Sequence, residues 1–299
     1  MSAYRLVSGL SWRIKHLGEK MDVAGRDGKS EGKMRYRLAV AFGALLLTTG
    51  CQTMGEKTAS KKPEPTSQSE RLANLAKDIE GRGESDTALP LYARAAAMPE
   101  ASAAIMVQAG DAYSRAGQPE EAINAYKAAL AKSPENGPAL LGMGTALIQI
   151  GDLSAGVSAL TTAAPVVGTS SAYNRLGVAL TMTGQTQDAV AAYQKALSMA
   201  PEDVDIQSNL ALAAALQGDA SAVEQAAQKV EASGTAELHH KRNIVLAYGL
   251  IGHDQQVRSS TPAGLTSGEV DRILKLAAKA RSKGSVTAKA AALQDVMSG

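Results

Sequence analysis

The sequence predicts an all-α fold, a solenoid of about six helix-turn-helix repeats followed by a C-terminal capping helix. Hydrophobic residues make up 45% of the 299 residues, while aromatic residues make up only 3%. A chain so rich in alanine and leucine favours helices over strands. Glycines also recur every 33 or 34 residues along most of the chain. One copy of such a repeat cannot bury its apolar face alone, so we expect the copies to stack.

The repeat is defined by six glycines in near-constant register, Gly83, Gly117, Gly151, Gly184, Gly218 and Gly252. A small residue stands seven positions before most of them, which lets two antiparallel helices approach closely. Tyr92, Tyr126 and Tyr193 stand nine positions after their glycines. We expect each glycine to end a first helix with positive φ. We expect each tyrosine, on the second helix, to fill the gap between neighbouring first helices.

This pattern resembles the tetratricopeptide repeat (TPR) over residues 69–258. The resemblance is strongest around Gly117 and Gly184 and weaker around Gly218 and Gly252. After Arg258 the pattern breaks at SSTPAGLTSGE. An amphipathic helix at about residues 269–281 is predicted to cap the open end of the solenoid. The residues after it are expected to fray.

A second pattern begins at Met34, where the chain reads MRYRLAVAFGALLLTTGCQT. A basic start, a short apolar run and a small-residue end are typical of a secretory signal peptide. The run Leu38–Leu47 is about half the roughly 20 residues that a membrane-spanning helix needs. The end of the run resembles the lipobox of bacterial lipoproteins, which implies cleavage before Cys51 and a covalent lipid on that cysteine. The alternative is that Leu38–Leu47 forms the first helix of a cytosolic protein, with Cys51 buried.

The predicted organisation has five parts. Residues 1–33 are interpreted as an upstream over-call or leader extension, and residues 34–50 as a lipoprotein signal peptide. Residues 51–68, rich in Lys, Ser, Thr, Pro and Glu, are predicted to be a flexible linker. Residues 69–258 form the TPR domain, and residues 259–299 the capping helix and tail.

Charge and residue types restrict the class of function. Residues 1–50 hold nine Lys or Arg and four Asp or Glu, so the 22 basic and 25 acidic residues that follow carry a net charge of −3. No basic stripe is available for a nucleic-acid backbone. No catalytic constellation is apparent, so we predict no enzyme activity and no cofactor besides the lipid on Cys51. His239 and His240 are adjacent and should face different sides of a helix, so no metal site is predicted.

The TPR resemblance implies a groove along the first helices that binds a protein partner. It maps groove-facing positions onto Val107, Asp111, Leu141, Ile148, Val178, Met182, Leu212, Leu216, Leu246 and Leu250. The apolar C-terminal part of this set suits an amphipathic helix or an apolar strand. Two interpretations stay open, because these leucines either bind a partner or pack on the tail helix or on neighbouring copies.

Three asparagines resemble part of a TPR clamp that grips a C-terminal carboxylate. They are Asn174, Asn209 and Asn243. The first-helix lysines of that clamp are missing, so this mode is rejected. The asparagines are expected to bond neighbouring backbone.

An acylated cysteine, a polar linker and a TPR solenoid together resemble the TadD family, the TPR lipoproteins of tight-adherence (Flp-type) pilus assembly. The stretch RNIVLAYGLIG, Arg242–Gly252, resembles the last copy of that family. The resemblance implies a pilotin-like lipoprotein on the periplasmic face of the outer membrane, reached through its lipid. Its protein partner would be a secretin or another pilus assembly component, with no nucleic acid bound. The alternatives are a general TPR scaffold lipoprotein for outer-membrane or cell-wall assembly, and a soluble TPR adaptor.

Overall fold

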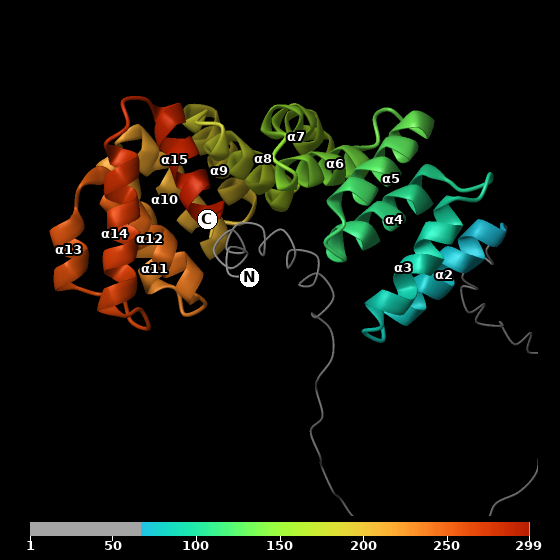
Figure 1. The fold of residues 1–299 in the computed structure, drawn as a ribbon, viewed down its shortest axis with the longest axis horizontal. Helices are drawn as coiled ribbons and strands as arrows, with labels where there is room; N and C mark the ends of the chain where they lie inside the picture. The colour runs from blue at the N-terminus through green and yellow to red at the C-terminus, as the bar shows by residue number, and fades with distance from the viewer. Residues whose placement is uncertain (1–66, 299) are drawn as a thin grey trace, which may run out of the picture.

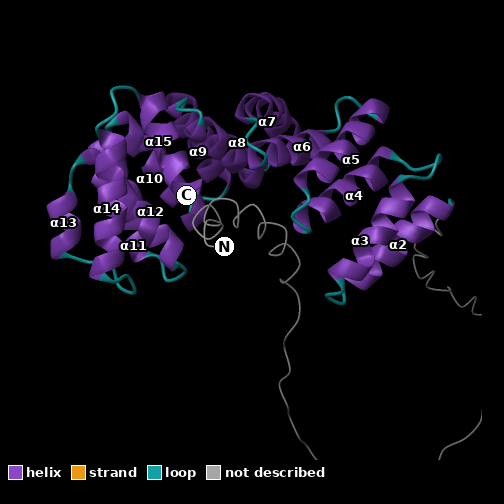
Figure 2. Cartoon of the chain, in the orientation of Figure 1, coloured by secondary structure: helices purple, strands orange, loops and turns teal. Residues whose placement is uncertain are grey.

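The computed structural model describes residues 67–298, and within that range the secondary structure is helical, without a strand (Figure 2). The helices are α2 (Gln68–Glu80), α3 (Ser85–Ala96), α4 (Ala103–Arg115), α5 (Pro119–Lys132), α6 (Gly137–Gln149), α7 (Leu153–Val167), α8 (Ser170–Met182), α9 (Thr186–Met199), α10 (Val204–Gln217), α11 (Ala220–Ala232), α12 (Leu238–Ile251), α13 (Asp254–Ser259), α14 (Ser267–Arg281) and α15 (Val286–Ser298). The predicted leader, Cys51 and most of the predicted linker lie outside these residues.

The helices form consecutive antiparallel pairs that follow one another along the molecule, from α2 and α3 at one end to α12–α14 at the other (Figure 1). Each first helix contacts its own second helix and the first helix of the next pair. Buried side chains form four clusters in sequence along the solenoid rather than one central core. This nearest-neighbour packing is what stacked repeats require. The predicted all-α solenoid is confirmed.

All six register glycines have positive φ, between +72° and +88°. At Gly218 and Gly252 the glycine itself is the left-handed residue that caps the first helix. Side chains with a Cβ rarely adopt this conformation, so glycine is selected at each turn. The expectation drawn from the register is therefore confirmed.

Tyr126 shows how the repeats interlock. It lies on α5 and is 1% exposed. A Cβ added at Gly110 of α4 would lie 2.5 Å from the tyrosine ring, and one added at Gly142 of α6 would lie 2.3 Å from it. The ring thus fills the gap between two neighbouring first helices, as predicted, because both helices present a glycine to it. Tyr193 of α9 lies against Gly177 of α8 in the same way.

The C-terminal end differs in part from expectation. Helix α14 packs on α12 and begins two residues before the predicted cap, where Thr266 accepts a hydrogen bond from the Glu269 N–H at 3.2 Å. The second helix of the sixth pair, α13, has only six residues, because the repeat pattern breaks after it.

The expected fraying of the last residues is wrong, since Val286–Ser298 form helix α15. Helix α15 contacts α14 and also reaches back to α8 and α10. Val286, Ala290 and Leu293 recur at the i, i+4, i+7 spacing of one helix face and pack against the C-terminal core cluster. The folding of this segment therefore depends on a surface that the solenoid supplies. No helix among the described residues is long and apolar enough to cross a membrane.

Candidate partner-binding groove

The candidate site is the row of first helices α4, α6, α8, α10 and α12, here called the groove. The structure places the ten predicted positions in pairs on these helices, two on each. Five of them, Ile148, Met182, Leu212, Leu216 and Leu246, line a single pocket. The others lie elsewhere along the row. A role for any of the ten in binding stays a prediction.

The N-terminal half of the groove contains a hydrogen-bonded polar cluster around Asp111. The Tyr126 hydroxyl donates to Asp111 Oδ1 at 2.7 Å, and Ser114 Oγ lies 3.3 Å from the same hydroxyl. Desolvation by burial raises the pKa of Asp111 and outweighs the opposing effects of the Tyr126 bond and of Arg115 and Arg175. Burial also raises the pKa of Tyr126, with Asp111 adding to the rise. Asp111 therefore holds repeat helices together at the groove surface and does not project freely towards a partner.

The C-terminal half of the groove is apolar and hollow. A pocket of about 270 Å³, called the hollow below, opens between the first helices. Its apolar lining from the repeats is Ile148, Leu153, Met182, Leu212, Leu216 and Leu246. These residues come from α6, α7, α8, α10 and α12, so the hollow spans four consecutive repeats. The apolar C-terminal positions of the sequence indicated an apolar surface in this half of the groove.

Helix α15 forms one wall of the hollow, through Ala290, Leu293 and Gln294. The Gln294 side-chain amide donates to the carbonyl of Met182, the last residue of α8. At the start of α15, the backbone of Thr287 approaches the turn after α8 so closely that a Cβ on Gly184 would lie 2.6 Å from Thr287 Cα. Sequence reasoning missed this contact, although the spacing of Val286, Ala290 and Leu293 was a signal for it.

Of the two interpretations left open for the groove leucines, packing on the C-terminal tail is therefore observed. Leu246 packs against the same core cluster as Leu293, and Leu212 and Leu216 are buried in it. The helix that covers them is α15, whereas α14 covers the end of α12.

The asparagines link neighbouring first helices. Asn209 of α10 donates to Asn174 Oδ1 of α8 at 3.2 Å, and Asn243 of α12 donates to Ser208 Oγ at 3.4 Å. The expected backbone partners are wrong, because each first helix lies close enough to the next for polar side chains to bond directly, Asn209 to Asn174 and Asn243 to Ser208.

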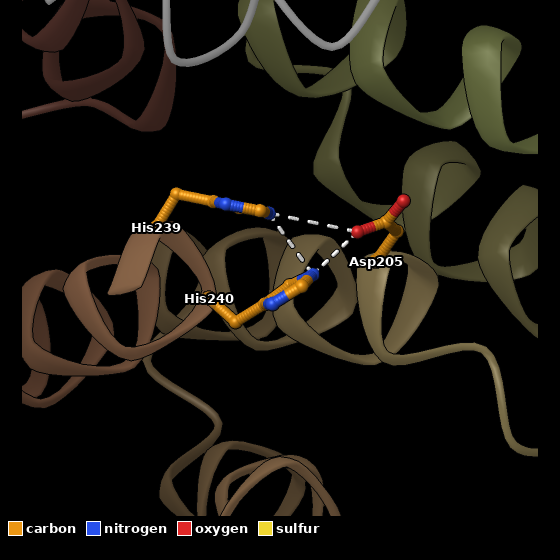
Figure 3. Close-up of side chains that lie close together, drawn as sticks. All are labelled: Asp205, His239 and His240. Atoms are coloured by element: carbon orange, nitrogen blue, oxygen red, sulfur yellow. Dashed lines mark hydrogen bonds and ion pairs between the residues drawn. The ribbon is translucent and has the colours of Figure 1, made fainter. Parts of the chain in front are cut away.

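Two histidines and an aspartate form a cluster between the N-terminal turns of α10 and α12 (Figure 3). The ring centroids of His239 and His240 lie 3.8 Å apart, and both Nε2 atoms face Asp205. The expectation that the rings face different sides of a helix is wrong. Both residues lie in the first turn of α12, and Asp205 on the adjacent first helix attracts both rings.

The ligand atoms of Asp205, His239 and His240 lie within 4.8 Å of one another, close enough to reach one metal ion. The hydrogen bonds indicate that the cluster has a structural role instead of binding a metal ion. The Glu237 N–H donates to His240 Nδ1 at 2.9 Å. A neutral His240 therefore carries its proton on Nε2, and this N–H donates to Asp205. In this state the Nε2 lone pair is not available to a metal, and the cluster is a hydrogen-bonded link between α10 and α12.

Comparisons with known proteins agree with the fold. Two tetratricopeptide repeat models match the chain, over residues 113–177 and 170–203, and neither describes a catalytic family. No curated protein matches it. MamA 41-end from Desulfovibrio magneticus RS-1 is similar in structure, with 21% identity, a TM-score of 0.50, and coverage of 55% of this chain and 93% of that one. The MamA RS-1 ArsTM double mutant gives 20% identity, a TM-score of 0.50, and coverage of 54% and 91%.

YrrB, described as a TPR protein with an unusual peptide-binding site, gives 20% identity, a TM-score of 0.47, and coverage of 53% of this chain and 84% of that one. At 20% and 21% identity, the likeness to the two MamA structures establishes the fold alone. The repeat models and the helix pairs together show that the chain carries tetratricopeptide repeats in an all-helical solenoid.

Proposed function

We propose that this chain is a protein-binding scaffold whose groove holds an apolar segment of a partner protein. The observation that carries the proposal is the hollow, because apolar side chains from four consecutive repeats surround it. A large apolar surface that is left open on a protein typically marks a site where another molecule docks. An elongated apolar groove on helices suits an amphipathic helix in particular.

We further propose that a lipid on Cys51 holds the scaffold at the periplasmic face of the outer membrane, where it assists Flp (Tad) pilus or secretin assembly. Support comes from the sequence, through the leader from Met34 to Cys51 and the family-like stretch RNIVLAYGLIG. The lipid supplies the location and the groove supplies the partner.

Substitution in the groove tests the scaffold proposal. Leu212→Asp combined with Leu246→Asp places two charges in the hollow, so we expect co-purification of the partner from detergent extracts to be lost. The helical circular dichroism should persist. Leu75→Asp is the control, because Leu75 lies on first helix α2 and is 49% exposed. Unchanged co-purification with the double variant would contradict the proposal.

The anchor has an independent test. Cells expressing the wild-type chain should incorporate labelled palmitate into it, and the Cys51→Ser variant should not. Equal labelling of the two would contradict the anchor. Identification of the co-purified protein by mass spectrometry tests the pilus proposal. A secretin or pilus component supports it, whereas a partner from general outer-membrane or cell-wall assembly favours the wider scaffold role.

A further inference from the structure

Helix α15 occupies the position in which a partner helix would lie. It belongs to the C-terminus, yet its contacts reach first helices α8 and α10, and Gln294 bonds Met182 from 112 residues away in the chain. Figure 1 shows α15 beside α10 and α14 at the C-terminal end of the solenoid. The groove therefore accepts a helix, and α15 shows which face of a helix it accepts.

The fit of α15 is incomplete. Its residues 287–293 read TAKAAAL, so that alanine dominates the segment. With Ala290 and Leu293 in place, the hollow of about 270 Å³ remains beneath the helix. A second pocket of about 570 Å³ lies beside it, between α7, the end of α8 and the α15 residues Thr287, Ala291 and Gln294. An engineered apolar cavity of roughly 150 Å³ is already large enough to bind benzene.

The space left by alanine defines what would fit better. A helix with leucine, isoleucine, methionine or phenylalanine in place of Ala290 would fill the hollow and bury more apolar surface against Leu212, Leu216 and Leu246. Each added buried methylene favours such a helix over α15. We therefore expect α15 to bind the groove weakly, because its small alanine side chains make few van der Waals contacts.

The linker between α14 and α15 allows α15 to dissociate from the groove. Residues 282–285, SKGS, connect it to α14, and all four are exposed. The capping helix α14 holds its own place through Arg281, whose guanidinium pairs with Asp254 at 3.1 Å and donates to the carbonyl of Gly249. These contacts of α14 involve no residue of α15, so the capping helix would keep them if α15 left the groove.

We propose that α15 is an internal occupant of the groove, and that the partner is an amphipathic helix with bulky apolar side chains that displaces it. This inference rests on the proposed function, since it takes the groove as the partner site. A tether as short as four residues holds α15 at an effective concentration on the order of millimolar. A partner must overcome this concentration, so α15 excludes weak ligands and admits helices that fill the hollow.

The first test uses the full chain and a defined probe, a fluorescent synthetic peptide of residues 285–298. In the Leu293→Asp variant, a charge in the hollow releases α15 and opens the groove. The matched control is Ala288→Asp, because Ala288 is exposed in the first turn of the same helix and follows the Ser285 cap. We expect the peptide to bind Leu293→Asp at least about tenfold more tightly than wild type or the control, because the tethered competitor is gone. Equal affinity for all three chains, or binding to none, would overturn the proposal.

The second test uses the wild-type chain and needs no variant to fold. A peptide of residues 285–298 with Ala290→Leu fills the hollow better than α15 does. The backbone N–H groups of α15 lose protection when the helix is displaced, so the peptide should accelerate hydrogen exchange of the α15 amides severalfold, and a scrambled peptide should not. If the rate is unchanged, α15 is a fixed part of the fold and the proposal fails.

The two proposals can fail separately. Suppose that Leu212→Asp with Leu246→Asp abolishes partner co-purification, while Leu293→Asp shows no gain in affinity for the peptide. The scaffold function is then supported and the displacement mechanism is wrong. If the two substitutions in the hollow leave co-purification unchanged, the hollow is not the partner site and the scaffold proposal is wrong.

Discussion

The Tyr126 hydroxyl donates a hydrogen bond to Asp111 Oδ1 at 2.7 Å and thereby joins the two helices of one repeat at the groove surface. The neighbouring repeat on the N-terminal side has the same arrangement, because the Tyr92 hydroxyl donates to Glu80 Oε2 at 3.0 Å. In each case a tyrosine that fills the gap between first helices also supplies a donor to a carboxylate on the first helix of its own repeat. Packing and hydrogen bonding thus fix the same ring.

Tyr126→Phe should destabilise the chain by about 1–3 kcal/mol, because it keeps the ring but leaves the desolvated Asp111 without this donor. Tyr113→Phe is the matched control. Tyr113 packs against the same core cluster as Tyr126, and its hydroxyl makes no hydrogen bond with the described residues, so we expect a change within about 0.5 kcal/mol. Urea denaturation followed by circular dichroism measures both. A loss at Tyr126 no larger than the change at Tyr113 would contradict the role given to Asp111.

Asp111 also predicts a pH dependence. Burial raises its pKa in the folded state above the unfolded value. The native state then binds the proton more tightly, so this group's contribution to stability falls as pH rises from the unfolded to the folded pKa. Asp111→Asn should therefore be more stable than wild type at pH 7, and the difference should shrink as pH falls from 7 towards about 4, the unfolded pKa. A difference that does not vary between pH 7 and pH 3 would show that the carboxylate is not desolvated.

The glycines of the repeat predict opposite effects for one substitution. Gly142→Ala places a Cβ 2.3 Å from Tyr126 Cζ, and the clash should cost about 1–3 kcal/mol, more than the gain in helix propensity of about 1 kcal/mol. Gly268→Ala, in the first turn of α14, meets nothing within 4 Å and should raise stability by up to about 1 kcal/mol. Thermal unfolding of the two variants compares them directly. The same sign for both would refute the account of close helix approach.

Much of this packing could be predicted, because glycine register reports a backbone requirement that is local. Each of the six glycines needs positive φ at its own turn, so sequence alone places the turns. The position of α15 could not be predicted in this way, because it depends on contacts with α8 and α10, which end 104 and 69 residues before α15 begins. The convergence of His239 and His240 was also missed, because their direction is set by Asp205 on another helix and not by helical periodicity.

Glu269 predicts an acid-sensitive end of the solenoid. The hydrogen bond from Arg242 at 2.8 Å, with bonds from Thr266, lowers the pKa of Glu269 to about 2. A lowered folded pKa adds stability above the unfolded pKa, and this stability is lost as pH falls from about 4.5 to about 2. Glu269→Gln should flatten the stability profile of α14 in that window, as measured by hydrogen exchange of its amides. Identical profiles for Glu269→Gln and wild type would contradict the pairing across α12 and α14.

The histidine cluster offers a prediction that separates a structural link from a metal site. The Glu237 N–H donates to His240 Nδ1, so a neutral His240 should carry its proton on Nε2, pointing at Asp205. Nitrogen-15 NMR of the histidine side chains reports this tautomer directly. Because the Nε2 lone pair is then occupied, one equivalent of Zn²⁺ should leave the His240 signals in place. Stoichiometric shifts of both His239 and His240 with Zn²⁺ would show instead that the Glu237 bond breaks and that the three side chains hold a metal.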